Sequence, residues 1–327
     1  MKKIINNPND VVSEMLEGFA RGNPKIIYFP EFAVISRKEK KRKVGLVSGG
    51  GSGHEPAHAG YVGKGMLDAA VAGNVFSSPG PDRIIKGIKE ANNGEGVLLI
   101  IKNYAGDIMN FELAKELAEM EDVQIEYVIV KDDVAVPDST YSTGRRGIAG
   151  TVFVHKIAGA KAEAGGTLEE VKKVAQQTID NIRSMGMSMS PCILPNVGKP
   201  AFELAENIME IGMGIHGEPG VEKTEIGNAS KIAEVLTNRI LEDMDFIGSE
   251  VALMVNGLGG TPLMELYILN NEVSKILDSK NIKIHRTFVG NYMTSLEMSG
   301  ASVTLLKLND ELKELLDAPS DAPSFHV

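Results

Sequence analysis

Short apolar runs alternate with segments of helical periodicity in the first part of the chain, and this alternation restricts the possible folds most strongly. Residues 69–76, 96–101 and 123–130 predict strands, whereas residues 82–91 and 108–120 have the spacing of helices. Strands separated by helices at this interval favour βαβ units around a mostly parallel sheet. Because ligands bind beyond the carboxyl ends of such strands, binding residues are expected in the loops that follow them.

The second part of the chain predicts a similar architecture, with no detectable sequence repeat between the two. A chain of 327 residues exceeds the size at which one core usually stops growing, so two domains are expected. The composition shifts to Met, Ser and Pro near residues 185–196, which suggests the boundary. We therefore predict two α/β domains, residues 1–185 and 186–327, each with a central mostly parallel or mixed sheet flanked by helices.

Composition excludes several classes of partner. The net charge is −10, and the basic run at residues 37–43 is interpreted as a solvated loop, so nucleic acid and membrane are not expected to bind. Cys192 is the only cysteine, which rules out an internal disulfide and fits a reducing compartment. No signal peptide or membrane-spanning segment is recognisable, so we expect a cytoplasmic protein.

A glycine-rich stretch, residues 48–56 (SGGGSGHEP), follows a short apolar run at residues 43–47. The pattern predicts a strand, a glycine loop and a helix that begins at Pro56, with His54 and Glu55 at the rim. The loop lacks the Gly-Lys-Ser/Thr ending of a phosphate-binding loop, and it fails the dinucleotide fingerprint because His54 replaces the last glycine. The alternative is a tight turn that binds nothing.

Two further groups of residues could carry chemistry. His216 lies between glycines in residues 214–220 (GIHGEPG), where its ring has an open approach and could act as a nucleophile or base; the alternative is a turn with a surface histidine. Lys102 and Asp107 follow an apolar strand, and Asp107 could accept a proton or a hydrogen bond from a substrate hydroxyl; the alternative is a helix cap.

Other candidates are interpreted as structural. The remaining histidines, His58, His155, His285 and His326, are assigned to packing or to the surface, and no metal-ligand spacing is present. The methionines of residues 185–189 indicate core or hinge packing rather than a metal site. Arg145 and Arg146 either occupy a solvated turn or meet phosphate or a partner's carboxylates.

Several blocks taken together resemble the dihydroxyacetone kinases, in particular their substrate-binding K part, over essentially the whole chain. The blocks are residues 48–56, 94–107 (GEGVLLIIKNYAGD), 132–136 (DDVAV), 144–147 (GRRG), 214–220, 257–267 (GLGGTPLMELY) and 291–308 (NYMTSLEMSGASVTLLKL).

The resemblance implies a role for each matching residue. His216 would hold the ketone dihydroxyacetone as a covalent hemiaminal, and His54 and Asp107 would bind its hydroxyls and act as acid/base groups. The pocket would be completed by Gly51, Ser52, Gly53 and Lys102.

The resemblance also implies partners. In this family the nucleotide is carried by an all-helical L part, so no cofactor is expected on this chain, and ADP or ATP with Mg²⁺ is expected on L. The chain stops at residues 317–327 without such a part, which resembles the free-standing K subunit of the bacterial phosphoenolpyruvate-dependent system. There, a phosphotransferase-system donor rephosphorylates L. A homodimer is expected.

Two alternatives remain open. One is a non-catalytic K paralogue that binds the ketone as coactivator of a transcriptional regulator, although the presence of His54, Lys102 and Asp107 favours the enzyme. The other is a binding protein for another short hydroxy-ketone or aldehyde such as glyceraldehyde.

Overall fold

The computed structural model describes residues 2–137, 144–218 and 220–327, and the chain divides into two compact units. Unit 1 comprises Met1–Val130, Phe153–Thr178 and Leu312–Val327, and unit 2 comprises Lys131–Val152 and Ile179–Glu311. The chain therefore passes between the units several times. The division into two domains at residues 185 and 186, each able to fold by itself, stays a prediction.

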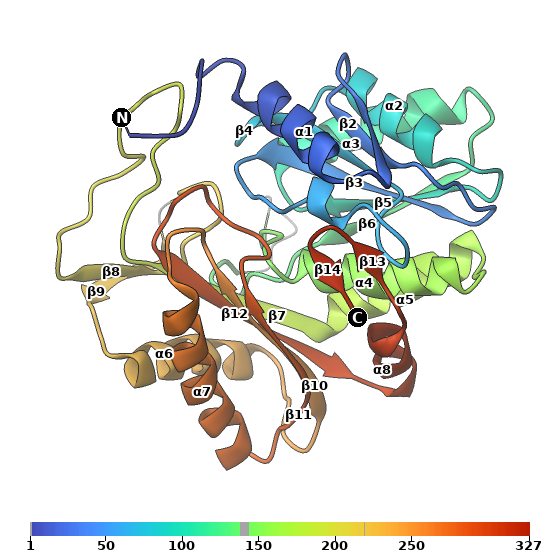
Figure 1. The fold of residues 1–327 in the computed structure, drawn as a ribbon. Helices are drawn as coiled ribbons and strands as arrows, with labels where there is room; N and C mark the ends of the chain where they lie inside the picture. Colours follow the sequence, from blue (N-terminus) through green and yellow to red (C-terminus); the bar gives the residue numbers. More distant parts are fainter. Residues whose placement is uncertain (1, 138–143, 219) are drawn as a thin grey trace. The chain divides into compact units, whose positions relative to one another are not determined.

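A mixed six-stranded sheet forms the centre of unit 1, in the order β1-β2-β4-β3-β5-β6 (Figure 1). Strands β4, β3, β5 and β6 are parallel, and β1 and β2 add an antiparallel edge. The strands are β1 (Ile26–Phe29), β2 (Val34–Arg37), β3 (Gly45–Ser52), β4 (Ala69–Val75), β5 (Val97–Lys102) and β6 (Ile125–Val130). This sheet confirms the parallel arrangement predicted from the alternation of strands and helices.

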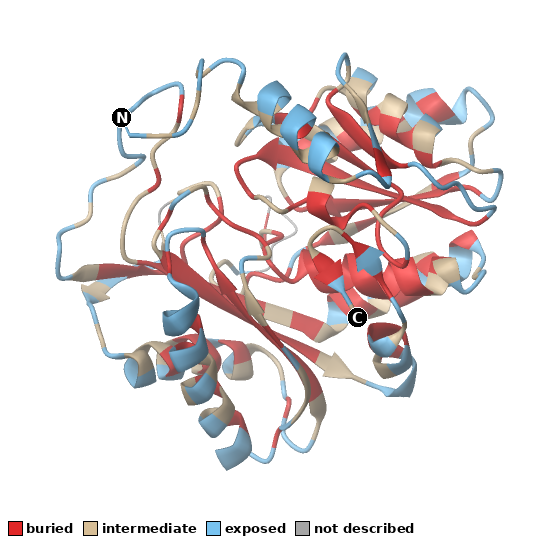
Figure 2. Cartoon of the chain, viewed as in Figure 1, coloured by how far each residue is buried: buried red, intermediate tan, exposed pale blue. Residues whose placement is uncertain are grey.

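Helices α2 (Pro81–Ala91) and α3 (Ala105–Glu119) pack on this sheet through a core that includes Ile84, Ile88, Phe111 and Leu99. Both β3 and β5 are buried along their whole length (Figure 2), as expected for parallel strands that are covered on both faces. The other helices that contribute to unit 1 are α1 (Val11–Gly22), the 3₁₀ turn η1 (Ala59–Tyr61), α4 (Thr151–Glu163), α5 (Leu168–Asn181) and α8 (Asp310–Asp317), with a small hairpin of β13 (Asp321–Ala322) and β14 (Phe325–His326).

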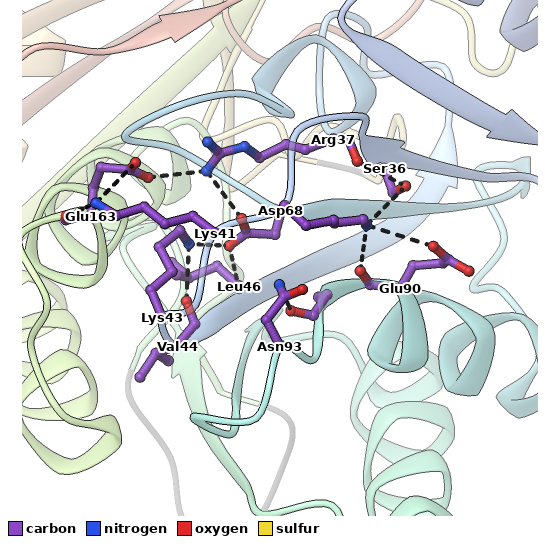
Figure 3. A network of polar contacts seen from close by, with 12 residues as sticks. Ser36, Arg37, Lys41, Lys43, Val44, Leu46, Asp68, Glu90, Asn93 and Glu163 are labelled. Carbon is purple, nitrogen blue, oxygen red and sulfur yellow. Dashed lines mark hydrogen bonds and ion pairs between the residues drawn. The ribbon is translucent and has the colours of Figure 1, made fainter.

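The basic run at residues 37–43 is not uniformly solvated, so the loop interpretation is partly wrong. Arg37 and Lys43 are buried, and both donate to the carboxylate of Asp68, at 3.1 and 2.5 Å (Figure 3). Asp68 also accepts a hydrogen bond from the backbone N–H of Leu46, and Arg37 reaches Glu163 on α4 at 3.0 Å. The first and last residues of this run therefore belong to a buried ionic network that ties α4 to β2 and β3.

Unit 2 contains a second six-stranded sheet, in the order β11-β10-β12-β7-β8-β9, in which only β10 and β11 are parallel. The strands are β7 (Ile182–Ser188), β8 (Ile208–Ile211), β9 (Glu222–Glu225), β10 (Glu250–Gly257), β11 (Lys283–Gly290) and β12 (Gly300–Leu308). Helices α6 (Ala229–Asp243) and α7 (Leu263–Ser279) pack on it through a core that includes Leu236, Val273 and Leu305. Both units are thus α/β layers, as predicted.

One local prediction was wrong. Residues 48–52 do not form a loop but continue β3 to Ser52, and no α-helix begins at Pro56, since only the short η1 follows. The interpretation of the methionines near residue 185 as core packing is confirmed, because Met185 and Met187 lie in β7 and are buried in the core of unit 2. Within the described residues, no helix combines the length and the apolar character that spanning a membrane requires.

Candidate active site

The glycine stretch forms the end of strand β3, and its backbone packs closely against two candidate side chains of unit 1, Lys102 and Asp107. A Cβ on Gly50 would lie 2.4 Å from Lys102 Nζ and 3.3 Å from Asp107 Oδ2, so a larger residue would displace both groups. Because β3 and β5 are parallel neighbours, their carboxyl ends lie at the same edge of the sheet. This confirms the expectation that residues from the glycine stretch and from the loop after β5 meet there.

Lys102 and Asp107 form a buried ion pair at this edge. Lys102 is the last residue of β5 and is fully buried, and its Nζ lies 3.2 Å from Asp107 Oδ2. Asp107 lies in the first turn of α3, where the helix dipole favours a negative charge, but the cap position is Tyr104. The helix-cap alternative for Asp107 is therefore wrong, and its carboxylate instead contacts the lysine.

His54 lies two residues beyond β3 and is fully buried. Its ring stacks on the ring of Phe76, with centroids 5.1 Å apart and planes at 16°. Phe76 directly follows β4, the strand parallel to β3. Next to His54, the carboxylate of Glu55 turns back to accept the backbone N–H of Gly53, at 3.0 and 3.1 Å. The ring orientation of His54 is thus set by elements at the same sheet edge.

The remaining glycine-stretch residues shape the backbone. A Cβ on Gly51 would collide with the backbone of Phe76 and Ser77, and the hydroxyl of Ser52 donates to the carbonyl of Gly73 at 2.8 Å. Gly53 adopts a φ of +101°, which favours glycine. These contacts account for the residue types on structural grounds, and a role for Gly51, Ser52 and Gly53 in substrate binding stays a prediction.

Two histidines assigned to packing or surface form a buried pair in unit 1. His58 Nδ1 lies 3.0 Å from His155 Nε2, and the hydroxyl of Ser48 lies 3.4 Å from the same His58 nitrogen. Burial, with the nearby charge of Lys102, lowers the pKa of His155 to about 3 and also lowers that of His58. Both rings are therefore neutral at pH 7. Their separation of 97 positions hid the pair from sequence reasoning.

His216 lies in unit 2, in the connection between β8 and β9, and its side chain is 17% exposed to solvent. The carboxylate of Glu218 contacts it twice, through the backbone N–H of His216 at 3.0 Å and through Nδ1 at 3.1 Å. Burial alone would raise the pKa of Glu218, but the hydrogen bond to His216, the charge of that ring when it is protonated, and the charge of Arg146 lower the pKa to about 2.

This contact selects one form of the ring. An ionised carboxylate accepts but does not donate, so Nδ1 carries the proton, and Nε2 of neutral His216 keeps its lone pair. That lone pair is what a nucleophile or a base requires. The sequence placed Glu218 beside His216 without assigning it a function. Pro219, in the same motif, lies outside the described residues.

The predicted residues therefore fall into two groups. Lys102 and Asp107 meet at Gly50 in unit 1, where His54 follows the same strand as Gly50, and His216 belongs to unit 2 with Glu218. Within the described residues, no group of three His, Cys, Asp or Glu side chains is arranged to hold a metal ion. A cavity of about 560 Å³ in unit 1 is lined by other residues, among them Lys25, Lys64 and Asp321.

Comparison with known proteins is consistent with this geometry. The Dak1 domain family matches residues 17–324. A Listeria innocua protein named as the dihydroxyacetone-binding subunit DhaK of a PTS-dependent dihydroxyacetone kinase is 51% identical, over 98% of this chain and 99% of its own. The corresponding Escherichia coli subunit, named PEP-dependent, is 40% identical over 100% of this chain and 99% of its own.

A solved structure of the dihydroxyacetone kinase of C. freundii superimposes with a TM-score of 0.93 at 35% identity, covering 99% of this chain and 60% of that one. A structure described as the dihydroxyacetone kinase operon co-activator DhaQ superimposes with a TM-score of 0.91 at 37% identity, covering 95% of this chain and 97% of that one. The match to the family extends over nearly the whole sequence, and the chain therefore belongs to the Dak1 domain family.

Proposed function

We propose that this chain is the dihydroxyacetone-binding subunit of a phosphoenolpyruvate-dependent dihydroxyacetone kinase. Support comes from subunits of that name that match almost end to end at 51% and 40% identity. The observation that carries the proposal is the contact between Glu218 and His216 Nδ1, because it leaves the other ring nitrogen able to attack a carbonyl.

Hemiaminal formation follows from this arrangement. The Nε2 lone pair forms a bond to the carbonyl carbon, and the electrons of the C=O π bond move to the oxygen, which takes up a proton. The ring gives up its Nδ1 proton in exchange, so the proton lost by the ring balances the proton gained by the oxygen and the hemiaminal is neutral. No atom is lost, so the adduct has the summed mass of protein and ketone. A polyol such as glycerol has no carbonyl carbon to attack, so this site would select the ketone over the polyol.

The second step is the transfer of a phosphoryl group to a substrate hydroxyl. The hydroxyl oxygen attacks the terminal phosphorus of the nucleotide, and the hydroxyl proton passes to His54 or Asp107. The bond from that phosphorus to the leaving oxygen breaks, and the nucleoside diphosphate remains bound to a separate L subunit. Positioning and charge do most of the work in such transfers. The proposal requires His54 and Asp107 of unit 1 and His216 of unit 2 to reach one substrate molecule.

The covalent step is tested by native mass spectrometry with and without dihydroxyacetone. We expect the wild type and the control His326→Ala, whose side chain is 65% exposed, to gain the mass of the ketone. His216→Ala should not gain it. A His216→Ala adduct at full occupancy would remove His216 from the role of nucleophile. Competition with glyceraldehyde in the same experiment tests the range of carbonyl ligands.

A second candidate function is a coactivator that binds the ketone and contacts a transcriptional regulator, since a co-activator structure is similar over 95% of this chain. The buried Lys102–Asp107 pair and the presence of His54 favour the enzyme, because a sensor needs only the group that binds the ketone. An assay with L subunit, phosphoryl donor and ketone distinguishes them. Formation of dihydroxyacetone phosphate supports the kinase, and adduct formation without turnover supports the coactivator.

We also propose that the nucleotide and Mg²⁺ bind to L, that a phosphotransferase-system protein is the donor, and that the chain forms a homodimer. Sedimentation of the purified chain tests the dimer. A nucleotide titration of this chain alone tests whether it binds ADP or ATP without L.

A further inference from the structure

Arg146 was interpreted from the sequence either as part of a solvated turn or as a ligand for phosphate or carboxylates, and the structure places it in a specific network of unit 2. Its side chain is 11% exposed. Nε donates to Asp133 Oδ2 at 2.8 Å, and Nη2 donates to the carbonyl of Gly212 at 2.7 Å. Asp133 is itself buried and accepts the backbone N–H of Ala135. The guanidinium is therefore held from two sides.

The third side of the guanidinium faces Gly214. A Cβ on Gly214 would lie less than 3.0 Å from both Arg146 Nη1 and Glu218 Oε2. The cation and the carboxylate thus pack against the same glycine, where a side chain would push them away. Arg146 also contributes its positive charge to Glu218. The absence of a side chain at Gly214 is what allows this approach.

From Glu218 the network continues to His216. The carboxylate accepts both the backbone N–H and the ring Nδ1–H of His216, so its orientation fixes the loop and the ring together. In this network Arg146 bonds Asp133, Arg146 and Glu218 both pack against Gly214, and Glu218 bonds His216. Only the last of these residues is assigned to react with substrate.

We propose that Arg146 is a positioning residue for His216: it holds the Glu218 carboxylate ionised and oriented, so that Nδ1 keeps its proton and Nε2 presents its lone pair. The inference rests on the proposed function for the identity of the reacting nitrogen. The requirement for arginine follows from its geometry, because a planar guanidinium can bond Asp133 and the Gly212 carbonyl while its third nitrogen faces Glu218.

The neighbouring Arg145 provides a matched control. It is the adjacent residue and is similarly buried, at 15% exposure, but its guanidinium binds Asp243 through two nitrogens. Arg145→Gln therefore removes one cation from the same turn without altering the network around His216.

The first measurement is the tautomer of His216, read from ¹⁵N shifts of its imidazole in long-range ¹H–¹⁵N spectra at a pH where the ring is neutral. The His216→Ala spectrum identifies its signals among the six histidines. We expect a single Nδ1–H form in the wild type and in Arg145→Gln. Arg146→Gln should show a mixture of tautomers.

The second measurement is the apparent affinity for dihydroxyacetone, read from adduct occupancy in native mass spectrometry. The loss of a charge-assisted contact predicts about 10- to 100-fold weaker binding for Arg146→Gln. Arg145→Gln should stay within about twofold of the wild type, and Arg146→Lys should fall between, because it keeps the charge but not the planar fork.

The outcomes are distinguishable. An Arg146→Gln protein with wild-type tautomer and affinity overturns the inference, and so does an equal loss in Arg145→Gln. If Arg146→Gln does not fold, Arg146→Lys and Glu218→Gln decide, because Glu218→Gln should give the same tautomer mixture and a wild-type spectrum in both variants contradicts the network. If the wild type forms no adduct, the proposed function fails, while the tautomer comparison still tests the contact from Arg146 to His216.

Discussion

His54 and His216 are the two histidines that the sequence selects, and they are held in place by different means. His54 follows a strand of a parallel sheet, is fully buried, and stacks on Phe76 from the neighbouring strand end. His216 lies in a connection between antiparallel strands and is partly exposed to solvent, and its Nδ1 contacts the carboxylate of Glu218. Packing of the sheet edge orients the first ring, whereas a dedicated anion orients the second.

A glycine supports each arrangement. Gly50 leaves room for Lys102 and Asp107, and Gly214 leaves room for Arg146 and Glu218. In both units the functional charges therefore lie against bare backbone. A buried ion pair beside a strand and a charge network in a loop thus solve the same problem, which is to hold an ionised group in one orientation.

The largest expected effect is a loss of phosphoryl transfer, and substitutions of His54 and His216 should differ in whether the dihydroxyacetone adduct still forms. The variants His54→Ala and Asp107→Asn should still form the dihydroxyacetone adduct. Their rate of phosphoryl transfer should fall by about 10²- to 10⁴-fold, because a proton acceptor is lost. His216→Ala should lose both. Native mass spectrometry and a coupled assay with L subunit and donor give the two readouts. Turnover at the wild-type rate in His54→Ala and Asp107→Asn would remove both groups from acid/base catalysis.

The two glycines should respond differently to the same substitution. Gly50→Ala and Gly214→Ala each force charged groups to move, which should cost about 1–3 kcal/mol of the free energy of unfolding. Gly50→Ala should mainly reduce transfer, and Gly214→Ala should mainly weaken the adduct. Urea unfolding and the two functional readouts measure this.

Gly18→Ala is the control for the glycine pair, because nothing lies within 4 Å of the added Cβ in α1. A helical alanine should stabilise the protein by about 0.5–1 kcal/mol. Equal destabilisation by all three substitutions would show that close packing at Gly50 and Gly214 is not the cause.

The buried histidines of unit 1 should make stability depend on pH. In the unfolded chain a histidine has a pKa of about 6.5, whereas in the folded protein the pKa of His155 is about 3. Between these values the unfolded state binds the extra proton, so stability falls as pH falls, by about 1.4 kcal/mol per pH unit. His155→Gln should reduce this slope below pH 6.5 in urea titrations, and the exposed-site control His326→Gln should not. An unchanged slope in His155→Gln contradicts the burial of a neutral ring.

The smallest expected effect concerns ring orientation. Phe76→Leu keeps an apolar contact but removes the stacking partner of His54, which is worth about 0.5–1.5 kcal/mol. Transfer should therefore fall by about two- to tenfold while the adduct is retained. A loss of adduct instead would mean that Phe76 also affects the substrate-binding step.

Much of the fold was predictable because local patterns agree with the tertiary arrangement. The helices predicted at residues 82–91 and 108–120 match α2 and α3 to within three residues, and the strand at residues 123–130 matches β6 to within two residues. The glycine stretch misled, because strands of glycine carry no apolar signal and were interpreted as a loop. The methionines of β7 were interpreted as core or hinge packing, and they lie in the core of unit 2.

The amino-acid sequence alone determines the α/β class, the family and the choice of His54, Lys102, Asp107 and His216, because glycine- and histidine-rich blocks in a fixed order are specific. Only the tertiary structure decides that Lys102 and Asp107 pack on Gly50, that His58 pairs with His155, and that Arg146 and Glu218 both pack against Gly214. The physical reason is that a charge becomes fixed by what lies beside it once water is excluded, and those neighbours come from distant strands and loops.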